Sequence, residues 1–164
     1  MDSDERMVLD SIPFQRLRHI HQLALTNLVY PGATHKRFEH SLGVMELADR
    51  VFAVVTHPHN LTDDIKNLLD PLTSPDKLSY WRRVLRMAAL CHDVGHLPFS
   101  HASEVLLPTG WDHETITRKI VCSDEMKEVW ESITPPLRHE DIEKLAVGQK
   151  RASDLTFSDW EAIL

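Results

Sequence analysis

One stretch of the chain carries apolar residues at the spacing of an α-helix and ends in two ionisable side chains. Between residues 79 and 92, Trp81, Leu85, Ala88 and His92 recur every three or four positions. This spacing places all four on one face of a helix, so His92 continues a face that turns toward the protein interior. No segment shows the alternation of period two that is typical of a half-buried strand, and no internal repeat occurs. The sequence therefore predicts an all-α fold.

Other helices are predicted from apolar spacing combined with capping residues. Pro13 suits the first position of a helix that ends at Thr26-Asn27, with Phe14, Leu17, Ile20 and Leu25 on its buried face. After the Pro31-Gly32 turn, a helix from Lys36 to Val55 buries Leu42, Met45, Ala48, Phe52 and Val55. Gly95 ends the helix of residues 79–92. The remaining helices are predicted at 62–69, 98–107, after the cap Asp112, at 124–133, at 139–147 and from Phe157 onward.

The bulk properties are those of an ordinary globular domain. The chain has 164 residues, of which 42% are hydrophobic and 26% charged, and this predicts one domain over residues 1–164. It lacks a run of 18 apolar residues, and its N-terminus, MDSDERM, is acidic where a secretory signal is basic and apolar. Two distant cysteines fit free thiols in a reducing compartment. We therefore expect an intracellular, cytoplasmic protein that does not enter a membrane.

The charge is unevenly distributed along the chain. The formal net charge of -7 argues against a surface that binds nucleic acid. Residues 11–38 nevertheless contain no Asp or Glu and carry seven basic or imidazole side chains, namely Arg16, Arg18, Lys36, Arg37, His19, His21 and His35. Such a segment attracts anions, although the same residues would also fit a solvated helix face.

The last residues predict a helix that has only begun. In SDWEAIL, Ser158 suits a helix cap, and only about one and a half turns follow it. A helix this short is marginal in water without packing partners. We therefore expect the chain to be the N-terminal part of a longer protein.

The residues that can carry chemistry gather after the helix of residues 79–92. A single histidine on a core-facing position is more often structural than a ligand. His92 is followed directly by Asp93, however, and a buried carboxylate is costly unless it is paired or bound to a metal. His40, on the helix that starts near Arg37, could join them. Two imidazoles and one carboxylate suit Mn, Fe, Ni or Zn.

A second set of ionisable residues lies close by in sequence. His96 and His101 flank a Gly-Leu-Pro turn, and His113 with Glu114 begins its own helix. An imidazole beside a carboxylate can act as a general acid or base near neutral pH. The alternative interpretation of these residues is helix-end capping.

Several stretches together resemble a known family. HKRFEHSLG at 35–43 and CHDVGHLPFSH at 91–101 are similar to the defining stretches of the HD-domain phosphohydrolases. The longer run at 14–43, FQRLRHIHQLALTNLVYPGATHKRFEHSLG, and WDHETI at 111–116 resemble the branch that hydrolyses deoxynucleoside triphosphates. A lone His-Asp pair is a weak signal, whereas this ordered set of stretches is specific.

The resemblance implies an HD-domain helical bundle and a set of site residues. It implies three ligands for a divalent transition metal (Mn, Fe, Ni or Zn) or Mg, namely His40, His92 and Asp93. Arg37 would hold phosphate, and Gln22 with Leu23 would lie against the sugar. Four further residues would line the phosphate site as catalytic and positioning groups, namely His96, His101, His113 and Glu114.

The implied reaction is attack of water on the α-phosphorus, which releases nucleoside and inorganic triphosphate. The implied partners are a nucleotide substrate and further copies of the chain. Arg16 and Arg18 would contribute at an interface between copies, or would be exposed helix charges.

The chain departs from the family pattern at two places. Glu104 stands three residues after His101, where the family often has Asp. The last metal ligand is expected in an acidic motif resembling DYLxRD, which is missing here, and neither Asp154 nor Asp159 has that context. Two other functions therefore stay open: an HD phosphatase or phosphodiesterase for another nucleotide, and a non-catalytic nucleotide-binding module.

Overall fold

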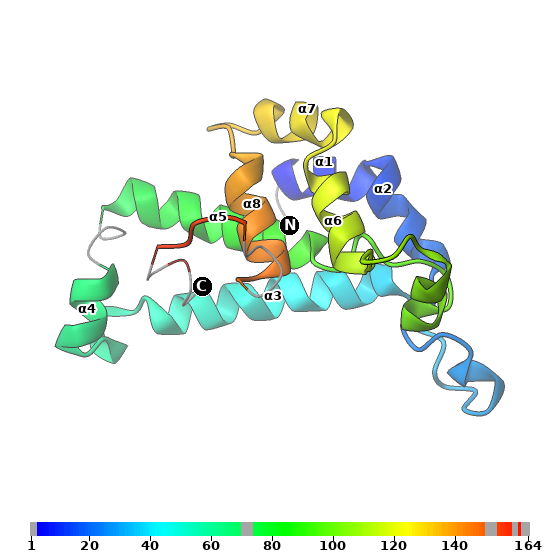
Figure 1. The fold of residues 1–164 in the computed structure, drawn as a ribbon. Helices are drawn as coiled ribbons and strands as arrows, with labels where there is room; N and C mark the ends of the chain where they lie inside the picture. Colours follow the sequence, from blue (N-terminus) through cyan, green and yellow to red (C-terminus); the bar gives the residue numbers. More distant parts are fainter. Residues whose placement is uncertain (1–2, 70–73, 150–153, 159–160, 162–164) are drawn as a thin grey trace.

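The computed structural model describes residues 3–69, 74–149, 154–158 and 161, and these residues form an all-α fold, as predicted (Figure 1). The α-helices are α1 Ser3–Asp10, α2 Ile12–Gln15, α3 Arg37–Val55, α4 Asp63–Leu69, α5 Pro75–Cys91, α6 His113–Val121, α7 Asp124–Ser132 and α8 His139–Val147. Short 3-10 helices are η1 Arg16–His19, η2 Thr26–Leu28, η3 Pro58–Asn60 and η5 Ser100–Leu106. Within the described ranges, the β-type pairing is limited to an isolated bridge between His21 and Lys36.

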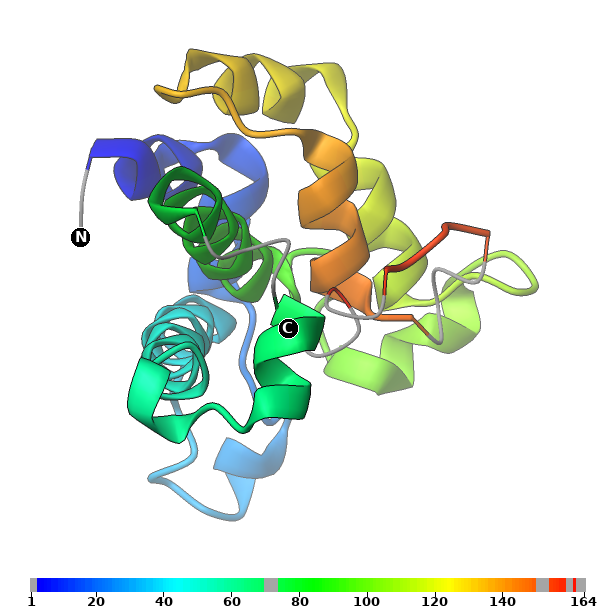
Figure 2. The same ribbon diagram turned by 90° about the vertical axis from the view of Figure 1, so that its left-hand side faces the viewer.

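Two long helices form the base of the molecule. Helices α3 and α5 lie side by side and run in opposite directions, as both views show (Figures 1 and 2). Helix α8 packs on α5 and α6 packs on α8, while α1 contacts α2 and α7. Because α3 begins and α5 ends at the same end of this pair, residues about 40 and 92 are brought together there.

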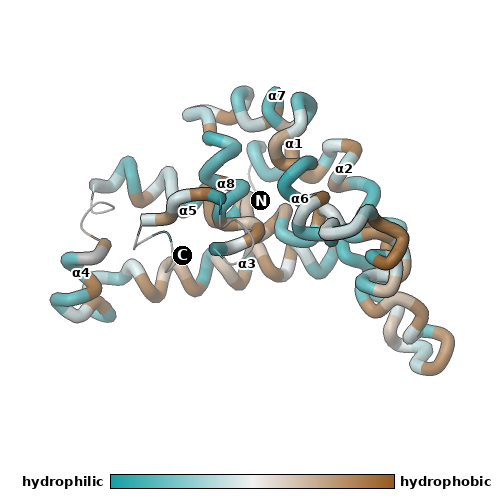
Figure 3. The backbone as a smooth tube through the Cα atoms, viewed as in Figure 1, coloured by the Kyte–Doolittle hydropathy of each residue, from teal (hydrophilic) through white to brown (hydrophobic). Residues whose placement is uncertain are grey.

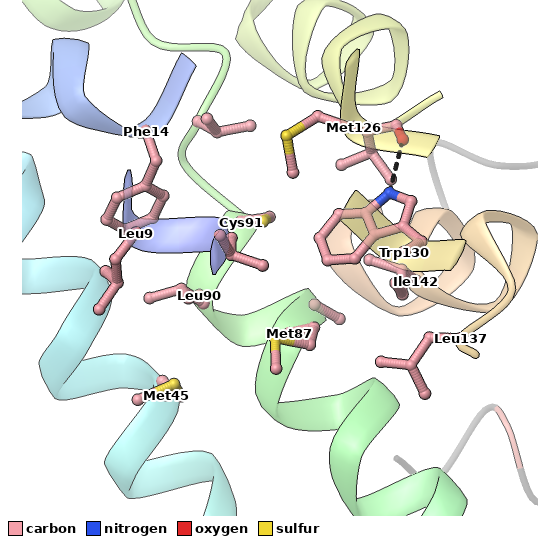
Figure 4. Close-up of a cluster of buried hydrophobic side chains, with 14 of the residues drawn as sticks. Leu9, Phe14, Met45, Met87, Leu90, Cys91, Met126, Trp130, Leu137 and Ile142 are labelled. Carbon is pink, nitrogen blue, oxygen red and sulfur yellow. Dashed lines mark hydrogen bonds between the residues drawn. The ribbon is translucent and has the colours of Figure 1, made fainter. Parts of the chain in front are cut away.

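The apolar core lies between α5 and the helices that cover it. Figure 4 shows Met87 and Leu90 of α5 facing Phe14 on one side and Trp130 with Ile142 on the other. The Trp130 indole Nε1 donates a hydrogen bond of 3.0 Å to the carbonyl of Val121, which satisfies its buried polar atom. Burial of each large side chain of this kind contributes about 1.5–3 kcal/mol to folding.

Helix α5 is longer than predicted, and its buried face is rotated. It begins at Pro75 because Ser74 caps it, with the Ser74 hydroxyl accepting from the Lys77 amide at 3.3 Å. The predicted stripe is confirmed at Ala88, which is fully buried, whereas Trp81, Leu85 and His92 are half-buried. Val84, Met87 and Leu90, which lie outside that stripe, are fully buried. Since α5 packs against both α3 and α8, its buried face is wider than one stripe.

The helix predicted over residues 13–26 is wrong in its length. An additional helix, α1, precedes it, and the segment itself stops being helical at His19. Backbone bonds then pair residues 20–22 with 35–37: the Arg37 amide donates to the Ile20 carbonyl at 2.9 Å. Ala24 adopts a positive φ of 50°, and Leu25 is 55% exposed, not buried. This nonlocal pairing overrides the local helical pattern.

The segment from residue 98 to 107 is a 3-10 helix that starts at Ser100, not an α-helix that starts at Pro98. Phe99 and Ser100 have positive φ values of 69° and 57°, which prevents a helix from running through them. The other predicted helices are confirmed to within a residue or two, including the cap by Asp112, whose carboxylate accepts from the Thr115 amide at 2.8 Å. Phe157 and Ser158 are not helical, and most of the helix predicted beyond them lies outside the described residues.

Several exposed apolar side chains lie on one projecting segment. Residues 20–36 extend away from the helices, and Figure 3 shows apolar residues at the tip of this segment. Leu28, Val29 and Tyr30 are 75%, 74% and 66% exposed. None of the helices in the described ranges combines the length and the apolar character that crossing a membrane requires. Cys91 and Cys122 are free thiols, as predicted.

Candidate metal centre

Three predicted ligands converge where α3 begins and α5 ends. His40 lies in the first turn of α3, His92 caps the C-terminus of α5, and Asp93 follows it. One ligand atom from each lies within 4.8 Å of the others. His40 Nε2 is 3.6 Å from Asp93 Oδ2, and His92 Nε2 is 3.4 Å from Asp93 Oδ1. We call His40, His92 and Asp93 the metal triad.

The ring of His92 is oriented by the helix that carries it. Its Nδ1 lies 2.7 Å from the carbonyl oxygen of Ala89. Because a carbonyl can only accept, Nδ1 donates to it, which leaves Nε2, the nitrogen that faces Asp93, as the atom available to a metal. This arrangement is the one in which metal-bound histidines are usually held. The donor set of two imidazole nitrogens and one carboxylate therefore fits a divalent metal ion.

Asp93 is buried and surrounded by basic groups. Arg37, itself 3% exposed, donates from Nη1 to Asp93 Oδ2 and from Nη2 to the Ser100 hydroxyl at 2.7 Å. Burial opposes ionisation of Asp93, but a hydrogen bond from His96 and the charges of His92 and Arg37 outweigh it. The pKa of Asp93 therefore lies well below its usual range. The group is a carboxylate at neutral pH and can act as a ligand without losing a proton first.

His40 is held in the neutral form that a metal requires. Burial lowers the pKa of His40, and the charges of His92 and Arg37 lower it further, while Asp93 acts in the opposite direction. A neutral imidazole keeps a lone pair for coordination.

The loop that follows the triad is held from two sides. Arg16 of η1 donates from Nη1 to the His96 carbonyl at 2.7 Å and from Nη2 to the Val94 carbonyl. On the other side, the Thr117 hydroxyl of α6 donates to the His92 carbonyl at 3.2 Å and accepts from the Gly95 amide at 3.0 Å. Arg16 is half-buried and so is not the exposed helix charge of the one expectation, while its role at an interface between copies stays a prediction.

Gly95 allows α6 to approach this loop. A Cβ at residue 95 would lie 2.1 Å from the carbonyl oxygen of His113 and 2.4 Å from the amide of Thr117. Both contacts are far below van der Waals distance, so only glycine fits. The sequence indicates Gly95 only as a helix stop and gives no sign of this contact. Thr117 and Ser100 could not be predicted either, because single hydroxyl residues carry no recognisable pattern.

A second cluster of ionisable groups lies beside the metal triad. It contains His96, His101, Glu104 and His113, and we call it the histidine group. Glu104 Oε1 is 3.0 Å from His101 Nδ1 and 2.5 Å from His113 Nδ1. Burial opposes ionisation of Glu104, but the hydrogen bonds from His113 and His101 outweigh it and lower its pKa. The longer Glu, in place of the Asp common in the family, thus reaches two imidazoles.

His96 connects the two clusters. Its ring stacks on that of His113 with centroids 3.9 Å apart, and its Nε2 is 3.4 Å from Asp93 Oδ1. Burial lowers the pKa of His96. The ionisable groups from His40 to His113 therefore form one continuous site.

Other predicted residues take positions outside these two clusters. Glu114 is half-buried in the first turn of α6 and belongs to neither group of ligand atoms. Gln22 is half-buried and Leu23 is 45% exposed, both on the projecting segment. Arg18 lies over the Phe38 ring, 3.7 Å from its centroid. Asp154 forms an ion pair with Arg118 at 2.8 Å, and Asp159 lies outside the described residues.

Known proteins are similar to this chain in sequence. The HD domain family matches residues 37–156. The uncharacterized protein MJ1154 of Methanocaldococcus jannaschii is 40% identical over 119 residues, which cover 73% of this chain and 21% of that protein. The deoxynucleoside triphosphate triphosphohydrolase SAMHD1 of Gallus gallus is 36% identical over 135 residues, which cover 76% of this chain and 20% of that protein.

A solved structure shows the same fold. The crystal structure of a hypothetical protein from Aquifex aeolicus matches with a TM-score of 0.66 and 33% identity, over 99% of this chain and 37% of that one. The chain thus spans about a fifth of the two relatives' lengths and little more than a third of the solved structure's chain. The match over residues 37–156 includes the metal triad and the histidine group. This chain belongs to the HD domain family.

Proposed function

We propose that this chain carries the catalytic site of a metal-dependent phosphohydrolase that cleaves deoxynucleoside triphosphates to nucleoside and inorganic triphosphate. The observation that carries the proposal is the continuity of the site: the metal triad touches the histidine group through Asp93 and His96. Relatives named as deoxynucleoside triphosphate triphosphohydrolases, which are 36% to 41% identical over parts of this chain, support the substrate class.

His40, His92 and Asp93 would hold a divalent transition metal such as Mn, Fe, Ni or Zn, or Mg. The bound ion would supply Lewis acidity at a phosphate oxygen and lower the pKa of a water molecule. Asp93 is already ionised, so the triad can bind a cation without a prior change of charge.

Arg37 supplies the positive charge that a triphosphate needs. Its guanidinium lies between Asp93 and Ser100, at the same end of α3 as His40. When Asp93 is a ligand of a cation, the N–H groups of Arg37 would donate to phosphate oxygens instead. The guanidinium would then stabilise the charge that develops on the phosphate. Gln22 and Leu23 lie against the sugar of the substrate.

The histidine group and Glu114 transfer protons and position the phosphates. Water attacks the α-phosphorus, the bond from phosphorus to the 5′ oxygen breaks, and a protonated imidazole of His101 or His113 gives its proton to that oxygen. Glu104 orients both rings through its contacts of 3.0 Å with His101 Nδ1 and 2.5 Å with His113 Nδ1.

The natural protein works on nucleotides in the cytoplasm, as a homo-oligomer. Support for assembly comes from exposed apolar side chains on the projecting segment, Leu28, Val29 and Tyr30, because exposed apolar patches commonly mark contact surfaces.

The test is incubation of the natural protein containing these residues with dGTP or dATP and Mn²⁺, with products separated by ion exchange. We expect triphosphate and nucleoside, no activity in EDTA, and loss of activity in His92→Asn and Asp93→Asn. The control is the pair His57→Asn and His59→Asn, which changes two exposed histidines and leaves activity intact. Release of phosphate from monophosphates alone would indicate a different HD phosphatase, and nucleotide binding without turnover would indicate a non-catalytic module.

A further inference from the structure

We infer that His101, Glu104 and His113, with His96 behind them, form a second divalent-cation site that takes Zn²⁺ or a similar ion and inhibits the enzyme. This site is separate from the metal triad, with which it shares no residue. One ligand atom from each of the four residues lies within 4.8 Å of the others.

The geometry around Glu104 suits a metal ion. The Nδ1 atoms of His101 and His113 both lie near the same carboxylate oxygen, at 3.0 Å and 2.5 Å, and the two rings stand at 75° to each other. In a tetrahedral zinc site, neighbouring ligand atoms are about 3.4 Å apart. Exchanging the bridging protons for a cation therefore requires each of the two imidazole nitrogens to move away from Glu104 Oε1 by less than an ångström.

His96 adds an independent indication. It is 2% exposed, and its Nδ1 is buried without a hydrogen-bond partner in the described part of the chain. Because its Nε2 lies 3.4 Å from the Asp93 carboxylate, Nε2 carries the proton, and Nδ1 keeps a lone pair. A buried lone pair without a partner is unfavourable, and a nearby cation or its bound water would satisfy it.

The donor chemistry selects the ion. Three imidazole nitrogens and one carboxylate oxygen favour Zn²⁺, Co²⁺ or Ni²⁺ over Mg²⁺, which prefers oxygen ligands. The His101 side chain is 68% exposed, so an ion from solvent can reach the site directly.

Inhibition is the functional consequence, and this part of the inference rests on the proposed function. The imidazoles that bind the second ion are those that transfer the proton to the leaving 5′ oxygen. An ion bound there blocks that transfer without displacing the metal triad's own ion.

Zinc stoichiometry tests the second site without any assay of activity. We expect equilibrium dialysis of the 164-residue chain against Zn²⁺ to give two ions per chain, and one ion for His101→Asn, Glu104→Gln or Asp93→Asn. The double variant Glu104→Gln/Asp93→Asn binds none. His101 is exposed, so His101→Asn preserves the fold and keeps the test valid if Glu104→Gln disturbs it.

The matched control is a variant in which His57 and His59 are both replaced by alanine. These two histidines are exposed, with ring centroids 5.2 Å apart, and the variant should still bind two ions. One ion bound to the unchanged chain and none to Asp93→Asn, two ions bound to His101→Asn, or loss of an ion in the His57 and His59 control would each overturn the second site. Absence of triphosphate release by the natural protein overturns the proposed function and leaves this stoichiometry intact.

Discussion

Asp93 is the residue at which all parts of the site meet. Its carboxylate contacts Arg37, both histidines of the metal triad and His96. A buried carboxylate with this many basic neighbours stays ionised and at the same time compensates the charge of a buried arginine.

Removing that carboxylate should destabilise the metal-free protein. In Asp93→Asn, Arg37 stays buried without its charged partner, and we expect the free energy of unfolding to fall by about 3 kcal/mol. Urea unfolding in EDTA measures the change. The matched variant Arg37→Met/Asp93→Asn removes both charges and should recover part of the loss. An Asp93→Asn protein as stable as the unchanged chain would show that the ion pair does not hold this site together.

At the scale of elements, the loop after His92 is held by η1 and α6, and both contacts can be tested. Arg16 donates to two backbone carbonyl groups of the loop, those of Val94 and His96. We expect Arg16→Gln to lower the affinity of the metal triad for its ion by about 10-fold to 100-fold, the range for residues that support metal ligands. Calorimetric titration with Mn²⁺ measures this affinity.

The control for Arg16 is its neighbour Arg18, which contacts the Phe38 ring and the Gln15 side chain. Arg18→Gln removes the same charge and should leave metal affinity unchanged. Equal effects of the two variants would mean that net charge, not the position of the loop, is responsible.

Two glycines give a second test at this scale. In Gly95→Ala, the new methyl group collides with the backbone of α6, and we expect a loss of about 1–3 kcal/mol of stability. Gly43 lies inside α3 with open space around it, so Gly43→Ala should stabilise the protein by about 0.5–1 kcal/mol. Thermal unfolding of the pair checks the opposite signs, and a Gly95→Ala protein that gains stability would refute the close approach of α6.

At the scale of the whole molecule, an ion-pair network joins α1, α3 and α5. Asp49 accepts from Arg82 at 2.6 Å and 2.8 Å and lies 3.2 Å from Arg86, which also binds Glu5. The hydrogen bond from Arg82 is the main cause of the lowered pKa of Asp49. Burial acts in the opposite direction and raises the pKa, while the charges of Arg86 and Arg82 lower it further.

This network predicts a defined dependence of stability on pH. A carboxylate whose pKa is lower in the folded state stabilises the fold above its unfolded pKa of about 3.9, and this contribution is lost as pH falls through the folded pKa. Arg82 is half-exposed, so screening by water limits the contribution to about 1 kcal/mol. Asp49→Asn should therefore lower stability at pH 7 and lower it less near pH 2, as measured by urea unfolding. An equal deficit at both pH values would contradict this account.

The fold was predictable where the signals are local. Helix α3, with Lys36 before it, and α6, capped by Asp112, carry their start signals and apolar faces in adjacent residues. The segment at 20–22 was mispredicted because its backbone pairs with residues 35–37, and a pairing across a loop leaves no periodic trace. The buried face of α5 was predicted only in part, because α3 and α8 both pack on this helix. The spacing of apolar residues does not show how many neighbours a helix has.

The site was predictable to a similar extent. His40, His92 and Asp93 belong to recognisable stretches, and the structure brings them together, although their role as metal ligands stays a prediction. The contacts of Arg16, Thr117 and Glu104 depend on side chains that meet only after folding. Glu114, Gln22 and Leu23 keep their predicted roles as proposals.

The most direct measurement of the central claim follows the oxygen of water through the reaction. The natural protein is incubated with dGTP and Mn²⁺ in water enriched in ¹⁸O, and the products are analysed by mass spectrometry. Attack of water on the α-phosphorus predicts one ¹⁸O atom in inorganic triphosphate and none in deoxyguanosine. Label in the nucleoside, or release of orthophosphate or pyrophosphate in place of triphosphate, would contradict the proposed reaction.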